Sequence, residues 1–153
     1  MREELIGRNR ELAAIAALLD SGRGALLVGD AGVGKSHLAT RIAESFVDDR
    51  GGHVEFISGT VAGRTITFGA VAHLLDPSGA PNEAVVIHQI VERLMHTTDA
   101  GGVVVVDDVD LLDDASRAAI HRLSGRAPML ATVRIDEATD PFVVSLWKDG
   151  NLE

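Results

Sequence analysis

The most constraining feature of this 153-residue sequence is a glycine-rich segment, residues 29–36, that reads GDAGVGKS. An unbroken apolar run, residues 25–28, comes directly before it, as in a strand that is covered on both faces of a parallel sheet. Apolar residues then recur at every fourth position, which is typical of one buried helical face. The segment therefore predicts a strand, a tight loop and a helix over about 34–47. The apolar residues of that helical face are Leu38, Ile42 and Phe46.

The same segment matches the pattern G-x-x-x-x-G-K-[ST] in full. Glycines let bare backbone approach phosphate groups, and successive N–H groups at the start of a helix form a positive cradle for an anion. We expect Lys35 to reach the β- and γ-phosphates and the hydroxyl of Ser36 to hold Mg²⁺. The alternative is a glycine-rich turn that carries a lysine by chance. The candidate nucleotide contacts are Gly29, Asp30, Ala31, Gly32, Val33, Gly34, Lys35, Ser36 and His37, the last only because it follows Ser36.

A second candidate feature is the apolar strand 103–106, which ends in Asp107 and Asp108. Strand ends of parallel sheets project into the crevice where ligands bind. Asp107 is the expected Mg²⁺ ligand opposite Ser36, and Asp108 is the expected general base that activates water. The alternative is an ordinary solvated pair of acids. The acids that follow are assigned to solvent or to helix capping: Asp110, Asp113 and Asp114.

Short apolar runs alternate with helical patterns along the rest of the chain, which is typical of a parallel α/β sheet. We therefore predict one domain, residues 1–153, with a three-layer α/β/α architecture. Asp114 is the expected cap of one helix, and the phenylalanines and Trp147 are expected in the core. Further strands are expected at 53–57 and 129–133, and helices around residues 12–19, after Thr67, from Pro81-Asn82, at 114–123 and at 142–148.

Composition narrows the class of protein. Lys and Arg number 14 against 23 Asp and Glu, a net charge of −9. DNA backbones demand a basic face, so this segment is not expected to bind DNA, whereas a nucleotide arrives with its own Mg²⁺. The absence of cysteine excludes disulfide frameworks and thiol catalysis. No apolar run reaches the ~18–20 residues of a membrane helix, and the charged N-terminal segment lacks a signal-peptide core, so we expect a cytoplasmic protein.

Four segments together resemble a known family: LIGRNRELAAIAALL, GDAGVGKS, VVVVDDVDLLDDAS and LATVR. They are similar to the N-terminal ATPase region of large LuxR-type transcriptional regulators, in the STAND branch of the AAA+-related P-loop ATPases. The resemblance covers nearly the whole chain, including TFGAVAHLL and SLWKDGNLE. It implies an ATP-dependent switch that gates a transcription regulator.

The resemblance also implies roles for two arginines. Arg8, with Gly7 before it and Glu11 behind it, would pack near the adenine and ribose; the alternative is a surface arginine before a helix. Arg134 matches the polar position that senses the γ-phosphate, and its alternative is a surface charge at a strand end.

Relatives of this type continue into a fifth strand, a helical lid, a repeat-rich sensor region and a DNA-binding helix-turn-helix. We therefore expect the 153 residues to be a fragment that contacts DNA only through a C-terminal domain absent here. Hydrolysis is expected to be slow, because the lid and any arginine donated by a neighbour are missing. The family's strand order would leave residues 25–28 as an open sheet edge without charge or proline. Self-association, or a terminal segment folded over that edge, is then expected.

Two other classes stay open at this point. A small-molecule kinase could use the same loop, but it would need a lid with several arginines, and residues 59–98 hold only Arg64 and Arg93. A non-hydrolysing scaffold, with or without bound nucleotide, is the other alternative.

Overall fold

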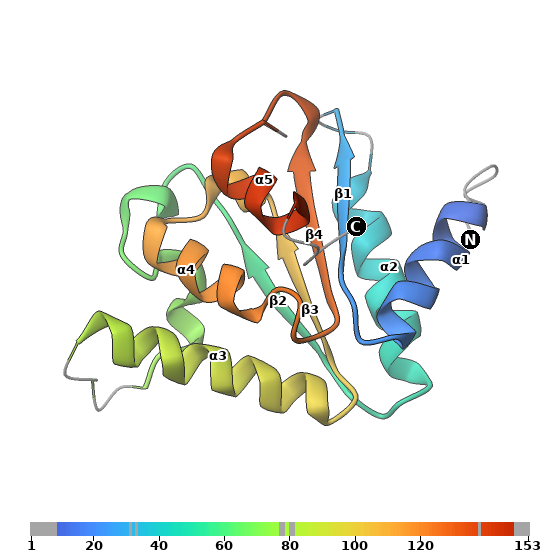
Figure 1. Cartoon of the computed structure of the whole chain (residues 1–153), viewed down its shortest axis with the longest axis horizontal. Coiled ribbons are helices and arrows are strands. Elements are labelled where there is room, and N and C mark those ends of the chain that lie inside the picture. The colour runs from blue at the N-terminus through green and yellow to red at the C-terminus, as the bar shows by residue number, and fades with distance from the viewer. Residues whose placement is uncertain are drawn as a thin grey trace.

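The fold is an open parallel sheet between two layers of helices (Figure 1). The computed structural model describes residues 9–30, 32, 34–76, 79, 82–137 and 139–148. All strand pairs are parallel, and the order across the sheet is β1-β4-β3-β2. The strands are β1 (Ala25–Gly29), β2 (Val54–Ser58), β3 (Val103–Asp107) and β4 (Met129–Arg134).

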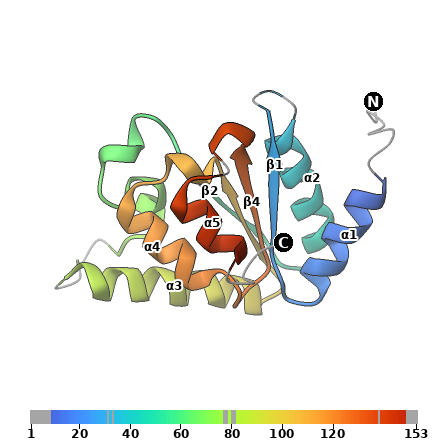
Figure 2. The ribbon, with the colours of Figure 1, turned by 45° about the horizontal axis from the view of Figure 1, so that its top comes forward.

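The helices divide between the two faces of the sheet, as Figure 2 shows. One face is covered by α1 (Asn9–Asp20) and α2 (Lys35–Asp48). The other is covered by α3 (Glu83–Asp99), α4 (Asp114–Leu123) and α5 (Pro141–Lys148). The predicted three-layer α/β/α class with a parallel sheet is confirmed.

The valines of β3 explain the unbroken apolar run in the sequence. Val103 and Val105 pack toward α1 and α2, while Val104 and Val106 join the core beneath α3, α4 and α5. All four are at most 2% exposed, because helices cover both sides of this central strand.

Short 3₁₀ segments connect several of these elements. Residues 60–75, between β2 and α3, contain η1 (Gly63–Thr65) and η2 (Gly69–Leu74). The short helix expected after Thr67 is therefore a 3₁₀ segment. Two others follow the neighbouring strands: η3 (Val109–Leu111) begins one residue after the end of β3, and η4 (Ile135–Glu137) begins directly after β4.

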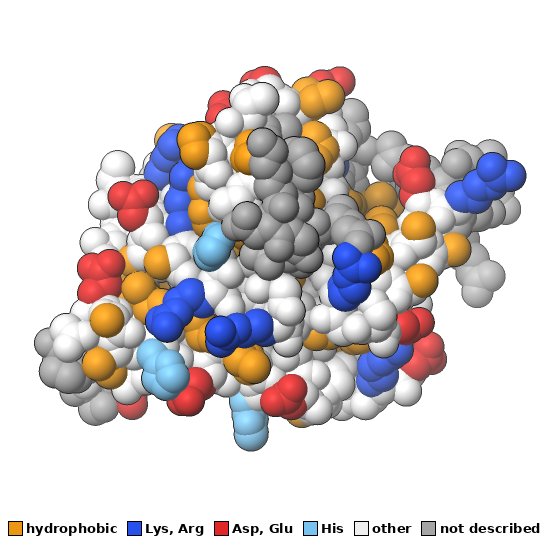
Figure 3. Space-filling model, viewed as in Figure 1, with side chains coloured by type: hydrophobic (Ala, Val, Ile, Leu, Met, Phe, Trp, Pro, Cys, Tyr) orange, Lys and Arg blue, Asp and Glu red, His pale blue; other side chains and the backbone are white. Residues whose placement is uncertain are grey.

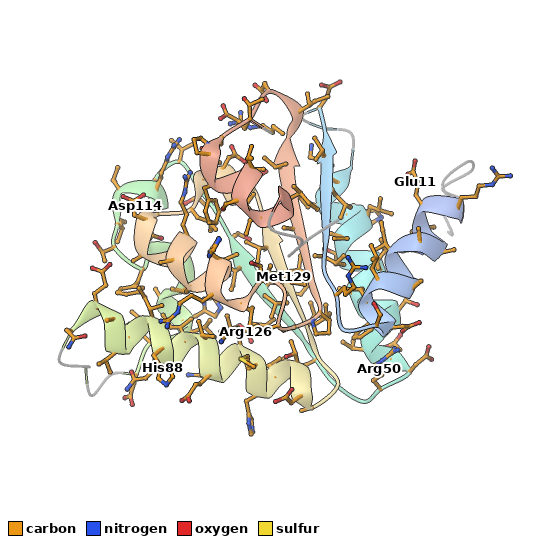
Figure 4. The ribbon with its side chains drawn as sticks, in the orientation of Figure 1. Glu11, Arg50, His88, Asp114, Arg126 and Met129 are labelled. Atoms are coloured by element: carbon orange, nitrogen blue, oxygen red, sulfur yellow. The ribbon has the colours of Figure 1, made fainter. Side chains whose placement is uncertain are left out.

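The cap of α4 was predicted one residue too late. Asp113, not Asp114, is the N-cap, and its carboxylate accepts a hydrogen bond from the backbone N–H of Ser116 at 3.1 Å. Asp113 is only 3% exposed, whereas Asp114 lies on the surface at the start of α4 (Figure 4). Asp110 is also not a solvated acid, since it is 2% exposed.

One aromatic prediction is also wrong. Phe56 is 46% exposed rather than in the core, because β2 is the outer strand and α2 packs mainly across β3 and β4. The side chain of Trp147 lies outside the described residues.

Arg50 joins the two helices of one layer (Figure 4). Its guanidinium forms an ion pair with Asp20, near the end of α1, and lies 3.9 Å from the ring centroid of Phe46 in α2. A cation over an aromatic face is attracted by the ring quadrupole. Arg50 is thus held against α2 by Phe46, and its ion pair with Asp20 connects α2 to α1.

The face formed by α3 and α4 carries both acidic and basic side chains (Figure 3). Among the described residues, no helix combines the length and the apolar character that a membrane span requires.

Candidate functional site

The carboxyl ends of three adjacent strands meet at one edge of the sheet. Gly29 at the end of β1 is the register partner of Arg134 at the end of β4, and β4 lies beside β3 with Val106 opposite Ala131. Parallel pairing therefore brings the glycine-rich loop, the acids after β3 and Arg134 to the same place. Such an edge is where open α/β sheets bind ligands.

The glycine-rich loop leads directly from β1 into α2. Gly34 precedes the helix with φ 87°, a left-handed backbone that a residue with a Cβ rarely adopts. The first N–H groups of α2 point toward the loop, as at any helix N-terminus, and they give this end of the helix a partial positive charge. Ala31 and Val33 lie outside the described residues.

Lys35 is folded against the loop that carries it. The side chain is 8% exposed, and its ammonium donates hydrogen bonds to the carbonyl oxygens of Gly29 at 2.8 Å and Asp30 at 2.7 Å. An ammonium has three donors, so two of them hold the loop in shape. Lys35 thus brings a compact positive charge to the head of α2.

Ser36 and Asp107 are brought together by the fold, although 71 positions separate them. The Ser36 hydroxyl donates to Asp107 Oδ1 at 2.7 Å. A hydroxyl and a carboxylate oxygen are hard ligands of the kind Mg²⁺ prefers, usually together with waters and substrate phosphates. No group of three or more acidic, histidine or cysteine residues suited to a metal occurs in the described chain. Ser36 and Asp107 supply two oxygen ligands of the kind that Mg²⁺ combines with waters and phosphates.

Thr132 in β4 supports the same carboxylate, and sequence reasoning missed it. Its hydroxyl donates to Asp107 Oδ1 at 2.5 Å and accepts from the backbone N–H of Asp108 at 3.0 Å. Thr132 is fully buried. A buried hydroxyl that both donates and accepts is satisfied, so it fixes the two acids relative to β4.

Asp108 stands in an unusual backbone conformation, with φ 51°. Left-handed backbone at a non-glycine residue is uncommon and is found preferentially at functional sites. Burial raises the pKa of the Asp108 carboxyl above its ordinary value, and Asp107 and Asp110 add to this effect, while Arg134 and Lys35 oppose it. A raised pKa is what a residue that accepts a proton during catalysis requires.

Gly59 explains how the backbone around Asp108 is packed. A Cβ at Gly59 would lie 2.3 Å from the carbonyl oxygen of Asp108, closer than any side chain tolerates. The residue after β2 must therefore be glycine for the acidic turn to sit where it does.

Arg134 forms an ion pair that the sequence did not predict. Its Nη2 lies 3.0 Å from Asp110 Oδ2, and a second acid, Glu137, lies at 3.8 Å from the same nitrogen. The hydrogen bond and the charge of Asp110 raise the pKa of Arg134 above its already high ordinary value. The guanidinium is thus a permanent cation beside the acids of β3.

A cleft of about 620 Å³ lies between α1 and β1 and adjoins the glycine-rich loop. Its lining includes Glu11 and Ile15 from α1, Val28 from β1, and Asp30 and Lys35 from the loop and α2. A largely apolar cleft of this size suits a small ligand such as a nucleoside.

Among the predicted site residues, the structure brings together Gly29, Lys35, Ser36, Asp107, Asp108 and Arg134. His37 is exposed on α2. Arg8 lies outside the described residues, as do Ala31 and Val33.

The strand, glycine loop and helix, with an acidic strand end beside them, define the core of a P-loop nucleoside triphosphatase. The family model of the AAA ATPase domain matches residues 4–135, and the chain therefore belongs to this family of P-loop NTPases. No curated protein matches the chain.

Solved structures match nearly the whole chain at low sequence identity. The DnaC helicase loader is 20% identical with a TM-score of 0.58, and the match covers 97% of this chain and 88% of that one. A DNA replication initiation factor is 16% identical with a TM-score of 0.57, over 98% of this chain and 46% of that one. This chain therefore spans less than half of the initiation factor, and the likeness shows the shared fold.

Proposed function

We propose that the chain is an ATP-binding switch module that uses Mg²⁺ and hydrolyses ATP slowly. The observation that carries the proposal is the 2.7 Å contact between Ser36 and Asp107, two oxygen-bearing side chains of the kind that Mg²⁺ prefers, at the mouth of the glycine loop. Lys35 and the head of α2 supply positive charge for the phosphates. Mg²⁺, when bound, would neutralise charge on the β- and γ-phosphates.

Three further roles belong to the proposal. Asp108 accepts a proton from the attacking water, in keeping with its raised pKa. Arg134 contacts the γ-phosphate, since it lies opposite Gly29 across the β1–β4 pair. The cleft beside Glu11 receives the nucleoside, where Arg8 is also proposed to contribute.

The wider context that we propose is a cytoplasmic transcriptional regulator of the large LuxR type. The resemblance of residues 103–116 and 130–134 to that group supports this context. DNA contact would then be made by another domain of the regulator, since this domain is acidic overall.

The test is a titration with ATP, ADP and a non-hydrolysable ATP analogue, with phosphate release followed in parallel. The wild type is expected to bind all three with Mg²⁺. Lys35→Ala is expected to abolish binding, whereas Asp108→Asn keeps binding and loses turnover roughly 100-fold, as expected for loss of a general base. Arg41→Ala, which removes an exposed charge from the same helix, is the matched control.

Two results would defeat the proposal: no binding by the wild type, or equal binding by Lys35→Ala. Turnover that requires an added small hydroxyl compound would instead favour a kinase. Binding without any turnover would favour a non-hydrolysing scaffold.

A further inference from the structure

The ion pair between Arg134 and Asp110 joins a partly exposed residue to a buried one. Arg134 is 37% exposed at the end of β4, and Asp110 is 2% exposed within η3. The contact between Nη2 and Oδ2 is 3.0 Å. Asp110 is therefore the fixed member of the pair, and Arg134 is the member with access to the ligand crevice.

Arg117 of α4 holds the backbone that carries Asp110. Its Nη2 donates to the Asp110 carbonyl oxygen at 2.8 Å, and its Nε donates to the Leu112 carbonyl oxygen at 3.1 Å. Two donors from one rigid guanidinium thus bind the middle of the short η3 turn and the residue that follows it. The position of the Asp110 carboxylate is consequently set by α4 rather than by the nucleotide loop.

Arg134 and Asp110 share one hydrogen bond, although a guanidinium and a carboxylate can form two. Arginine and carboxylate commonly form two parallel hydrogen bonds. Here Asp110 Oδ1 and Arg134 Nε are both buried, and neither has a hydrogen-bond partner among the described residues. The guanidinium thus keeps donors that Asp110 does not use.

Complete release of Arg134 from Asp110 is unfavourable. It would leave a buried carboxylate without a compensating charge, which is strongly destabilising. Glu137, 3.8 Å from the same Nη2, is itself a carboxylate and cannot supply the positive charge that Asp110 needs. An anion in the crevice is therefore met by an Arg134 that stays anchored.

The anchored guanidinium belongs to the same group of charges as the predicted catalytic residues. Burial, Asp107 and Asp110 raise the pKa of Asp108, and Arg134 and Lys35 lower it. In the β1–β4 pair, the backbone of Arg134 also lies opposite Gly29, the first residue of the glycine loop.

We propose that Asp110 is a positioning residue, which anchors Arg134 so that its remaining donors recognise the terminal phosphate of ATP and distinguish it from ADP. The inference rests on the proposed function, because it requires nucleotide at the glycine loop. The competing role, in which Asp110 withholds Arg134 from the phosphate, gives the opposite result in the test below.

The test is the ratio of ADP to ATP dissociation constants for the wild type, Asp110→Asn, Arg134→Gln and the double variant. Asp110→Asn is expected to lower the preference for ATP roughly three- to tenfold, by loosening one charged hydrogen bond. Arg134→Gln is expected to lower the preference at least as far. The double variant should match Arg134→Gln, because Asp110 acts only through Arg134.

Glu137→Gln is the matched control, since it removes a carboxylate near the same nitrogen but from the surface. It is expected to leave the ratio unchanged within twofold. An unchanged or increased ATP preference in Asp110→Asn, or an effect that adds fully to Arg134→Gln, would overturn the inference. Absence of nucleotide binding by the wild type would instead overturn the proposed function.

A measurement on the wild type keeps the inference testable if Asp110→Asn does not fold. Side-chain ¹⁵N resonances of Arg134, assigned with Arg134→Gln, report whether its guanidinium is held. They are expected to remain those of a hydrogen-bonded, slowly rotating group after a non-hydrolysable ATP analogue is added, and to shift more than with ADP. Loss of that restriction on adding the analogue would show that Arg134 leaves Asp110, contrary to the inference.

Discussion

At the scale of single residues, Thr132 shows how one hydroxyl organises the acidic strand end. It lies in β4 between apolar neighbours and is fully buried. Its bonds to the Asp107 carboxylate and to the N–H of Asp108 span two strands. Outer groups that orient a metal ligand commonly control metal affinity, so Thr132 is expected to affect a metal it does not touch.

Thr132→Val keeps the shape of the side chain and removes both hydrogen bonds. We expect the affinity for Mg-ATP to fall roughly tenfold, because Asp107 is free to rotate away from Ser36. ATP binding measured with EDTA should change little. Calorimetric titration in both buffers measures the two affinities.

Thr97→Val is the control for that change, since its hydroxyl donates to the Arg93 carbonyl oxygen of its own helix. An equal loss of affinity with and without Mg²⁺ in Thr132→Val would contradict the assigned role.

Sequence reasoning found the site residues that belong to local patterns and missed those defined by register or burial. Ser36 and Asp107 stand in recognisable motifs, and the structure joins them. Thr132 resembles an ordinary β-branched core residue, because nothing local reveals which strand lies beside β4. Asp110 and Gly59 were missed for the same reason: a buried ion pair and a close backbone contact depend on distant segments.

At the scale of elements, Asp113 connects α4 to η2. Besides capping α4, its carboxylate accepts hydrogen bonds from the N–H groups of Phe68 at 2.7 Å and Ala70 at 3.3 Å, and from the Ser116 hydroxyl at 2.6 Å. Phe68 has φ 60°, so the start of η2 is held in a left-handed turn by this acid. One carboxylate therefore caps the start of α4 and shapes another segment 43 residues earlier.

Asp113→Asn is expected to lower the free energy of unfolding by about 2–3 kcal/mol, because an amide NH₂ replaces an acceptor that faces buried donors. Urea unfolding measures the change. Asp114→Asn, one residue later on the surface, should cost less than about 1 kcal/mol, the usual size of a charge effect in the first helical turn. Equal effects of the two substitutions would contradict the assignment of Asp113 as the buried residue that connects α4 to η2.

The same substitution has a defined pH dependence. Burial raises the pKa of Asp113, but its hydrogen bonds from Ser116, Ala70 and Phe68 outweigh burial and leave the pKa below the ordinary value. A lowered pKa stabilises the folded state above the unfolded-state pKa of roughly 4, and this stabilisation is lost as the pH falls through the folded-state pKa. The stability difference between wild type and Asp113→Asn should therefore be constant near neutral pH and shrink in acid.

The order of elements was predictable because each strand and helix carries its own periodicity. Strands 103–106 and 129–133 were placed within a residue of β3 and β4. The η segments were harder, since 3₁₀ turns lack a strong repeat and depend on contacts such as those of Asp113.

At the scale of the whole molecule, the sheet order determines which strand is exposed at an edge. Local patterns do not encode this order, and only the family resemblance suggested it. In the described sheet β1 has a strand neighbour, β4, on one side only. Val28 of β1 is 47% exposed, and the strand carries no charged residue or proline of the kind that protects open edges.

We expect this edge to associate with a second copy of the chain. Light scattering over a wide range of concentration, without nucleotide, should show the wild type forming dimers or larger species. Val28→Lys should shift the protein toward monomer, because a lysine on an edge strand opposes further pairing. Val61→Lys is the control, because it adds the same charge at a residue that is 79% exposed and follows β2, the strand at the other edge of the sheet. This variant should associate like the wild type. A wild type that stays monomeric throughout, or equal dissociation by both lysines, would show that the β1 edge is not used between copies.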